Sequence, residues 1–178
     1  MLSWVVIAAA VFLSAPAFAR AQSVEAHASA GPTLVDRGHS VAVGSGWSPW
    51  SRLTVTLDIE RTVLATRATR DGQGGESAFR GGTVVLAAAG ARLALFPPGR
   101  VTPYLVAGVA AGRSHPTVNS RFPDAITNEA RAIFAGAGVE VPLGRRLGVY
   151  ADARMQLGGD GGEVLALAPL RAGLRWRF

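Results

Sequence analysis

Apolar and polar residues alternate along several stretches of this 178-residue chain. The alternation is cleanest in residues 170–178, where every second side chain is apolar and Arg171, Arg175 and Arg177 fall between them. Successive side chains of a β-strand point to opposite faces of the sheet. This segment therefore predicts a strand with one hydrocarbon face and one face that carries three guanidinium groups.

Seven further segments have strand character and are bounded by Gly, Pro or polar residues. In residues 53–64 and 147–157 apolar side chains alternate with polar or small ones, which is typical of a strand between lipid and a polar lumen. Pro169 cannot donate a hydrogen bond to a partner strand, so we expect a bulge or break in the last strand. The eight predicted strands are residues 24–35, 39–47, 53–64, 83–96, 101–113, 131–141, 147–157 and 164–178.

The connections between these segments differ in length at the two ends of the predicted sheet. Residues 48–52, 97–100 and 142–146 are tight turns rich in Pro and Gly, whereas residues 65–82 and 114–130 are long and polar. Short turns on one side and longer loops on the other are typical of bacterial outer-membrane barrels. We therefore predict an all-β fold, an eight-stranded antiparallel up-and-down transmembrane β-barrel, present as a monomer in the outer membrane of a Gram-negative cell.

The first residues predict export. An apolar run at residues 4–13 is too short to span a bilayer as a helix, and small residues that suit cleavage after Ala19 or Ala21 follow it. We expect a Sec-type signal peptide at residues 1–21 and the barrel domain at residues 22–178. The segment before the apolar run has no Lys or Arg, which leaves a buried N-terminal helix as the alternative.

The chain is strongly basic, and all eighteen of its basic residues are arginine. A pI of about 11.3 is typical of nucleic-acid-binding proteins. However, the arginines are scattered through apolar alternation, and an exported protein does not routinely meet nucleic acid, so we expect no such partner. The expected partners are outer-membrane lipids and the phosphates of lipopolysaccharide. With no cysteine and three isolated histidines, the sequence predicts no metal site and no cofactor.

Charged residues on the predicted inward faces balance in number, five acids against five arginines. Eight strands enclose a space that side chains just fill, and buried charges are costly unless paired, so we predict a charge network that plugs the lumen. Asp58 is expected near Arg92, and Glu25 near Arg175 or Arg177. His27 is expected to be a hydrogen-bonded lumen residue. The predicted network is Glu25, Asp58, Glu60, Arg92, Glu140, Asp152, Arg154, Arg171, Arg175 and Arg177.

Aromatic residues gather near the strand ends that meet at the tight turns. Amphipathic rings prefer the headgroup level of a bilayer, so these residues predict an interfacial girdle on the periplasmic side. If Tyr104 faces lipid, then Leu105 and Val109 face the lumen. The predicted periplasmic girdle is Trp47, Trp50, Phe96, Tyr104, Trp176 and Phe178. The residues available for a second girdle at the opposite end are Phe79, Phe122 and Phe134.

Four short motifs mark strand ends and turns: Ala89-Gly90-Ala91-Arg92, Thr102-Pro103-Tyr104, residues 136–141 and the terminal Arg175-Trp176-Arg177-Phe178. Together with the strand order, they resemble the outer-membrane protein β-barrel domain family, including its small OmpA- and OmpX-like barrels, over residues 22–178. The resemblance implies eight antiparallel strands and a role as an anchor, an adhesin or a weak channel. No catalytic set is common to that family, so the resemblance implies no catalytic residue here.

We expect an integral outer-membrane protein with a structural or surface-interaction role, inserted by the barrel-assembly machinery through the C-terminal strand that ends at Phe178. A narrow porin-like channel for small solutes is one alternative. A lipid A-modifying enzyme is the second, with His39-Ser40 at the top of a strand and Ser114-His115 in the third outer loop as candidate pairs. Adjacent strand residues point opposite ways, which disfavours the first pair, and neither pair has an acid at a recognisable spacing. A soluble lipocalin-like barrel with its large apolar side chains inside is the remaining structural alternative.

Overall fold

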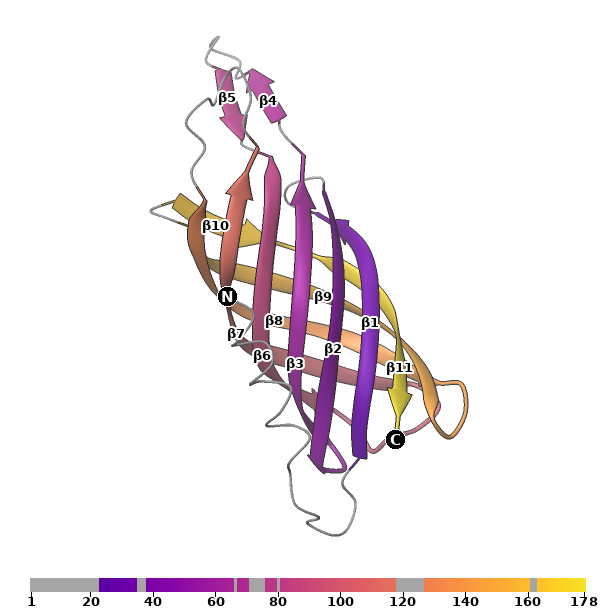
Figure 1. The fold of residues 1–178 in the computed structure, drawn as a ribbon. Coiled ribbons are helices and arrows are strands. Elements are labelled where there is room, and N and C mark those ends of the chain that lie inside the picture. Colours follow the sequence, from indigo (N-terminus) through magenta and orange to yellow (C-terminus); the bar gives the residue numbers. More distant parts are fainter. Residues whose placement is uncertain are drawn as a thin grey trace.

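The chain folds into a closed antiparallel barrel of tilted strands (Figure 1). The structure is a computed structural model that describes residues 23–34, 38–65, 67–70, 76–79, 81–117, 127–160 and 163–178, so the predicted signal peptide lies outside the described residues. No helix in this described part of the chain is long and apolar enough to span a membrane. The strands are β1 (Ser23–Thr33), β2 (Gly38–Trp50), β3 (Leu53–Leu64), β4 (Arg67–Arg70), β5 (Glu76–Phe79), β6 (Gly82–Ala94), β7 (Thr102–Pro116), β8 (Asn128–Pro142), β9 (Leu147–Asp160), β10 (Glu163–Leu167) and β11 (Leu170–Arg177).

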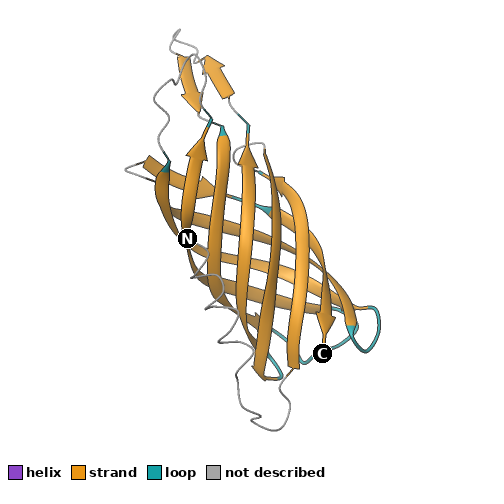
Figure 2. Ribbon diagram, viewed as in Figure 1, coloured by secondary structure: helices purple, strands orange, loops and turns teal. Residues whose placement is uncertain are grey.

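Antiparallel pairing follows the chain order and then closes the sheet. Each long strand pairs with the next one along the chain, from β1 through β2, β3, β6, β7 and β8 to β9. β11 pairs with both β9 and β1, with Glu25 opposite Arg177 and Ala30 opposite Ala172. Because β10 also pairs with β9, β10 and β11 together occupy one strand position, and the barrel wall has eight strand positions. The predicted fold class is confirmed, and Figure 2 shows the strands that make the wall.

Most polar side chains of the strands face the inside of the barrel, and most large apolar side chains face outward. Along β3 the inward side chains of Thr56 and Asp58 are buried, whereas the outward side chain of Ile59 is 48% exposed. Ile133 on β8 and Val43 on β2 are exposed in the same way. Burying polar groups while exposing large apolar ones is unfavourable in water and favourable in lipid, where the backbone must be satisfied by a closed ladder. The soluble lipocalin-like alternative is therefore wrong.

Four details of the strands differ from the predicted boundaries. β2 continues past Trp47 to Trp50 through a register irregularity, so the turn that we expected at residues 48–52 is reduced to Ser51 and Arg52. β7 extends to Pro116, and β8 begins at Asn128. β4 and β5 form a separate hairpin within the connection that we expected to be one long loop. Polar residues of that connection gave no alternation from which the hairpin could be predicted.

The predicted interruption of the last strand is confirmed. β10 ends at Leu167 and β11 begins at Leu170, with Pro169 between them. The Pro169 carbonyl still accepts a hydrogen bond from Arg154 N at 3.1 Å, and Pro169 bridges to Thr33 of β1. The barrel wall therefore stays joined where the proline cannot donate.

The two ends of the barrel differ. Three short connections, residues 51–52, 95–101 and 143–146, lie at the end where β1 begins and the chain finishes; we call this the turn end. The β4–β5 hairpin extends from the opposite end, which we call the loop end (Figure 1). This arrangement agrees with the predicted alternation of short and long connections.

Candidate functional site

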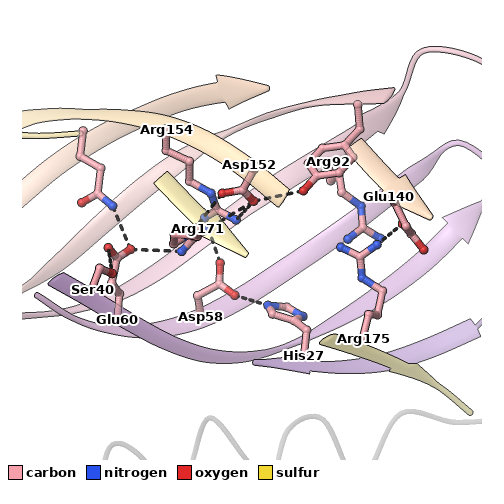
Figure 3. Close-up of polar contacts among 12 residues, drawn as sticks. His27, Ser40, Asp58, Glu60, Arg92, Glu140, Asp152, Arg154, Arg171 and Arg175 are labelled. Atoms are coloured by element: carbon pink, nitrogen blue, oxygen red, sulfur yellow. Dashed lines mark hydrogen bonds and ion pairs between the residues drawn. The ribbon is translucent and has the colours of Figure 1, made fainter. Parts of the chain in front are cut away.

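The barrel interior brings the predicted charge network together. Nine of its ten members are buried on inward faces, and the tenth, Arg177 at the mouth of the turn end, is half-buried. The members come from six different strands. Within a strand they lie at every second residue or at multiples of that spacing, because alternate side chains face inward. Figure 3 shows most of these side chains reaching toward one another across the lumen. The network divides into two clusters that share no ion pair among the described residues.

The turn-end cluster has two carboxylates and three guanidinium groups. Glu25 on β1 lies 3.0 Å from Arg92 Nη2 and 3.1 Å from Arg175 Nε. Glu140 on β8 forms ion pairs with Arg175 and with Arg177. Arg175 thus bridges the two carboxylates. The cluster carries one more positive charge than negative charges.

The second cluster lies deeper in the barrel and begins with Asp58 on β3. Its Oδ1 atom lies 2.5 Å from His27 Nε2, and its Oδ2 atom accepts a hydrogen bond from Arg154 Nη1 at 3.2 Å. The His27 ring also meets the ring of Tyr150 edge-on, with centroids 6.1 Å apart. His27 is therefore a hydrogen-bonded lumen residue, as predicted.

Asp152 and Arg171 hold the rest of the deeper cluster together. Arg171 Nε donates to Asp152 Oδ1 at 3.1 Å, and its Nη1 lies 3.4 Å from Glu60 Oε2. Asp152 also lies 3.3 Å from Arg154 Nη2. Glu60 accepts further hydrogen bonds from Ser40 at 2.7 Å and from Gln156 at 2.9 Å. Buried charges with this many partners are stabilised only as a set, because removal of one member leaves another unpaired.

Of the two predicted pairings, one is confirmed and one is wrong. Glu25 does lie beside Arg175, where β11 closes on β1. Asp58 does not pair with Arg92, because the β3–β6 register places Arg92 opposite Thr54 and Asp58 opposite Ala88. The side chain of Asp58 instead crosses the lumen to Arg154 on β9. In a narrow barrel, partners come from the opposite wall as well as from the neighbouring strand.

Besides the two ionic clusters, an apolar cluster fills the interior on the side of β6, β7, β8 and β10. Leu86 and Leu167 are among its most deeply buried members, and Phe134 lies over two glycines, Gly90 on β6 and Gly108 on β7. A Cβ atom on Gly90 or Gly108 would lie 2.8 Å or 2.6 Å from Phe134 Cζ, so only glycine leaves room for the ring. The cluster consists of Val84, Leu86, Ala88, Tyr104, Val106, Ala110, Ala130, Phe134, Leu165 and Leu167.

Known structures resemble this architecture, although no protein-family model and no curated protein matches the chain in sequence. The N-terminal β-barrel domain of Pseudomonas aeruginosa OprF is 18% identical, with a TM-score of 0.62 over 88% of this chain and 97% of that one. Neisserial surface protein A is 17% identical, with a TM-score of 0.65 and the same coverage. Ail, the attachment invasion locus protein of Yersinia pestis, solved with the heparin analogue sucrose octasulfate, is 14% identical, with a TM-score of 0.51 over 88% and 98% of the two chains. The fold is that of a small outer-membrane β-barrel.

Among the described residues, the exposed aromatic side chains of the barrel lie toward the turn end. Trp50, Phe96 and Phe178 are more than half exposed, and Trp47 and Trp176 face outward on β2 and β11. Their place at a membrane interface stays a prediction.

Tyr104 does not belong with the exposed aromatic residues, and its assignment to the girdle is wrong. Its ring is buried, its hydroxyl donates to Asp152 at 3.1 Å, and the Arg92 guanidinium lies 5.5 Å from its centroid. Leu105 and Val109 accordingly face outward rather than into the lumen.

Phe134 also lies inside the barrel. It was available for a girdle at the loop end, but it is buried, with the Arg154 guanidinium 5.3 Å from its centroid. Tyr104 and Phe134 were missed because β7 is apolar on both faces and β8 is nearly so. The inward parity that Arg92 sets on β6 could have been carried across the register to find both.

In each candidate catalytic pair, the serine and the histidine lie on opposite faces of the barrel wall. Ser40 faces inward and donates to Glu60, whereas His39 is exposed on the outside. Ser114 and His115 lie within β7 rather than in a loop, which corrects the prediction. Ser114 is buried inside, and His115 faces outward and lies 3.0 Å from the Thr127 hydroxyl. Neither serine can therefore be activated by its neighbouring histidine.

Proposed function

We propose that the protein is an integral outer-membrane protein of the Gram-negative envelope, with a structural or surface-interaction role and no open pore. The observation that carries this proposal is the filled interior. A cavity between the two ion-pair clusters, lined by His27, Arg92 and Asp152 among others, has a volume of only about 10 Å³. Such a space suits one water molecule and no hydrated ion. Paired charges and the apolar cluster occupy the cross-section that a channel would need.

Single-channel recording in planar bilayers tests this proposal against the narrow porin-like channel. We expect the refolded chain to insert without steps of current. The double variant Asp152→Ser with Arg171→Ser removes a buried acid and base together and should give small, resolvable steps, which shows that the assay would detect a pore. Reproducible steps from the unaltered chain would establish the channel instead.

The loop end supplies the surface for interaction. The β4–β5 hairpin extends beyond the barrel wall there, and two structural neighbours are a surface protein, Neisserial surface protein A, and an attachment invasion locus protein, Ail. An epitope inserted at residues 71–75, between β4 and β5, should bind antibody on intact cells. Labelling only after permeabilisation would mean that the hairpin faces the periplasm and that the orientation is inverted.

Three outward-facing arginines near the loop end are suited to lipopolysaccharide phosphates. Arg61 and Arg113 are both paired with Val85, one on each side, and Arg131 lies opposite Ala111 on the next strand. All three arginines are exposed. Guanidinium groups bind phosphate in a bidentate manner, which supports contact with the phosphates of the outer leaflet.

Lipopolysaccharide that copurifies with the protein tests this contact. Replacement of Arg61, Arg113 and Arg131 by Gln should lower the amount bound per barrel. The matched control replaces Arg100, Arg145 and Arg146, which are exposed at the turn end, and should leave it unchanged. An equal loss of bound lipopolysaccharide in both variants would contradict the proposed contact.

Export by the predicted signal peptide and insertion by the barrel-assembly machinery complete the proposal. Phe178 ends the outward apolar row of β11, and its backbone N–H donates to Val24 of β1 at 2.9 Å. Phe178→Ala should lower the fraction of heat-modifiable, folded protein in cells while purified protein still refolds in detergent. Normal assembly in cells would exclude a role for this residue in recognition.

A further inference from the structure

The mouth of the turn end is hollowed into a bowl of about 330 Å³. Its lining includes Arg92, Tyr104 and Glu140, which are buried, and Trp50 and Arg52, which are exposed. The volume falls at the lower end of the range for small-molecule sites. The remaining lining residues are largely hydroxylic and include Ser23, Ser48, Ser51, Thr54 and Thr102.

The charge of this end is strongly one-sided. The short connections contain Arg52, Arg100, Arg145 and Arg146, all exposed, and none of these connections contains an Asp or Glu. The side-chain carboxylates of the region, Glu25 and Glu140, are already shared among Arg92, Arg175 and Arg177. The bowl thus lies in a positive field that concentrates anions at its opening.

Arg52 is the cation of the bowl whose charge is not offset. Its backbone is fixed, since its carbonyl accepts a hydrogen bond from Ala94 N at 2.8 Å. It forms no ion pair with any residue that the structure describes. Arg52 lines the bowl together with Arg177, whose side chain is partly exposed although it pairs with Glu140. Two guanidinium groups and several hydroxyls can therefore donate to one ligand.

We propose that the turn-end bowl binds a small water-soluble oxyanion, a polycarboxylate or a phosphorylated solute. Guanidinium forks match the geometry of carboxylate and phosphate oxygens, and the hydroxyls add donors for the remaining oxygens. The lining side chains lie on inward faces and turns, so the ligand enters along the barrel axis from water rather than from the plane of the bilayer. With the proposed orientation, this water is the periplasm.

Titration of the refolded chain in phosphatidylcholine nanodiscs tests the proposal, with the fluorescence of Trp50 and the heat of binding as readouts. We use citrate and inorganic phosphate as probes, with glucose as the neutral comparison. Citrate should bind saturably with a stoichiometry of one, and glucose should not bind. Arg52→Gln should weaken citrate binding about tenfold, the usual effect of losing a hydrogen bond to a charged group.

Arg61→Gln is the matched control, because it removes an exposed arginine from the outer face near the loop end. It should change the Kd of citrate by less than about twofold, since the charge is distant and screened. Three results would overturn the proposal: citrate binding no stronger than that of glucose, equal effects of the two variants, or complete displacement of citrate by phosphatidylglycerol in the bilayer. The last result would assign these arginines to lipid headgroups. None of these results depends on whether the barrel conducts.

Discussion

The two halves of the barrel interior solve the same packing problem with opposite chemistry. Along β1, β3, β9 and β11, together with Arg92 of β6 and Glu140 of β8, buried acids and arginines neutralise one another in chains such as Glu60–Arg171–Asp152. On the side of β6, β7, β8 and β10, aliphatic side chains pack around Phe134. Each member of the ionic half depends on its partners, whereas each member of the apolar half contributes through the volume that it fills.

This difference predicts how damage spreads. Loss of a charged side chain leaves a second charge buried without compensation, and the cost exceeds the worth of the pair itself. Loss of an apolar side chain leaves a cavity that its neighbours partly close. The predictions below compare the two halves, and reversible urea unfolding of the barrel in lipid vesicles measures all of them.

Asp152→Ala should have the largest effect, a loss of about 4 kcal/mol in the free energy of unfolding. The change leaves Arg171 with Glu60 alone, weakens the hold on Arg154 and removes the acceptor of the Tyr104 hydroxyl. Asp152→Asn keeps the size and one acceptor oxygen and should cost less. A loss below about 1 kcal/mol for the alanine variant would mean that water already reaches these arginines.

Phe134→Ala should come next, with a loss of about 3 kcal/mol, because the ring is buried over Gly90 and Gly108 and nothing nearby is large enough to fill its place. Phe134→Leu keeps part of the side-chain volume and should lose less than Phe134→Ala. A leucine variant no more stable than Phe134→Ala would show that the apolar half is not limited by volume.

Arg131→Ala should have the smallest effect, within about 0.5 kcal/mol. This arginine forms an ion pair with Glu129 at 3.2 Å, but both side chains are about four-fifths exposed on the outer face. It is the matched comparison for a buried pair of the same chemistry. An effect as large as that of Asp152→Ala would mean that burial does not separate the two classes of ion pair.

The sequence predicted the ionic half of the interior far better than the apolar half. Where charged and apolar residues alternate, as at Asp58 and Arg154, parity alone identifies the inward face. On β7 the residues of both faces are mostly apolar, so alternation does not show which face is inward. Tyr104 was therefore placed on the wrong side. Periodicity carries information about facing only when the two faces differ in polarity.

Partners and strand ends were harder to predict than faces. Asp58 pairs across the lumen with Arg154. The register between neighbouring strands does not predict which residues meet across the lumen. β2 runs on to Trp50 because an irregularity after Trp47 absorbs Ser48 and Pro49, which otherwise read as a turn. Both features depend on how the whole barrel closes, which a local pattern cannot supply.

The central claim is that the exposed apolar side chains of the barrel face lipid and that its interior, which holds the buried charges, is sealed. Since the chain has no cysteine, single-cysteine reactivity in membranes tests this claim directly. We compare outward Val43→Cys, inward Thr56→Cys and the exposed turn variant Gly144→Cys. A charged, water-soluble maleimide should label only Gly144→Cys, and a lipid-soluble one should also label Val43→Cys. Rapid labelling of Val43→Cys by the charged reagent would place the apolar face in water, and rapid labelling of Thr56→Cys would open the lumen; either result would contradict the account.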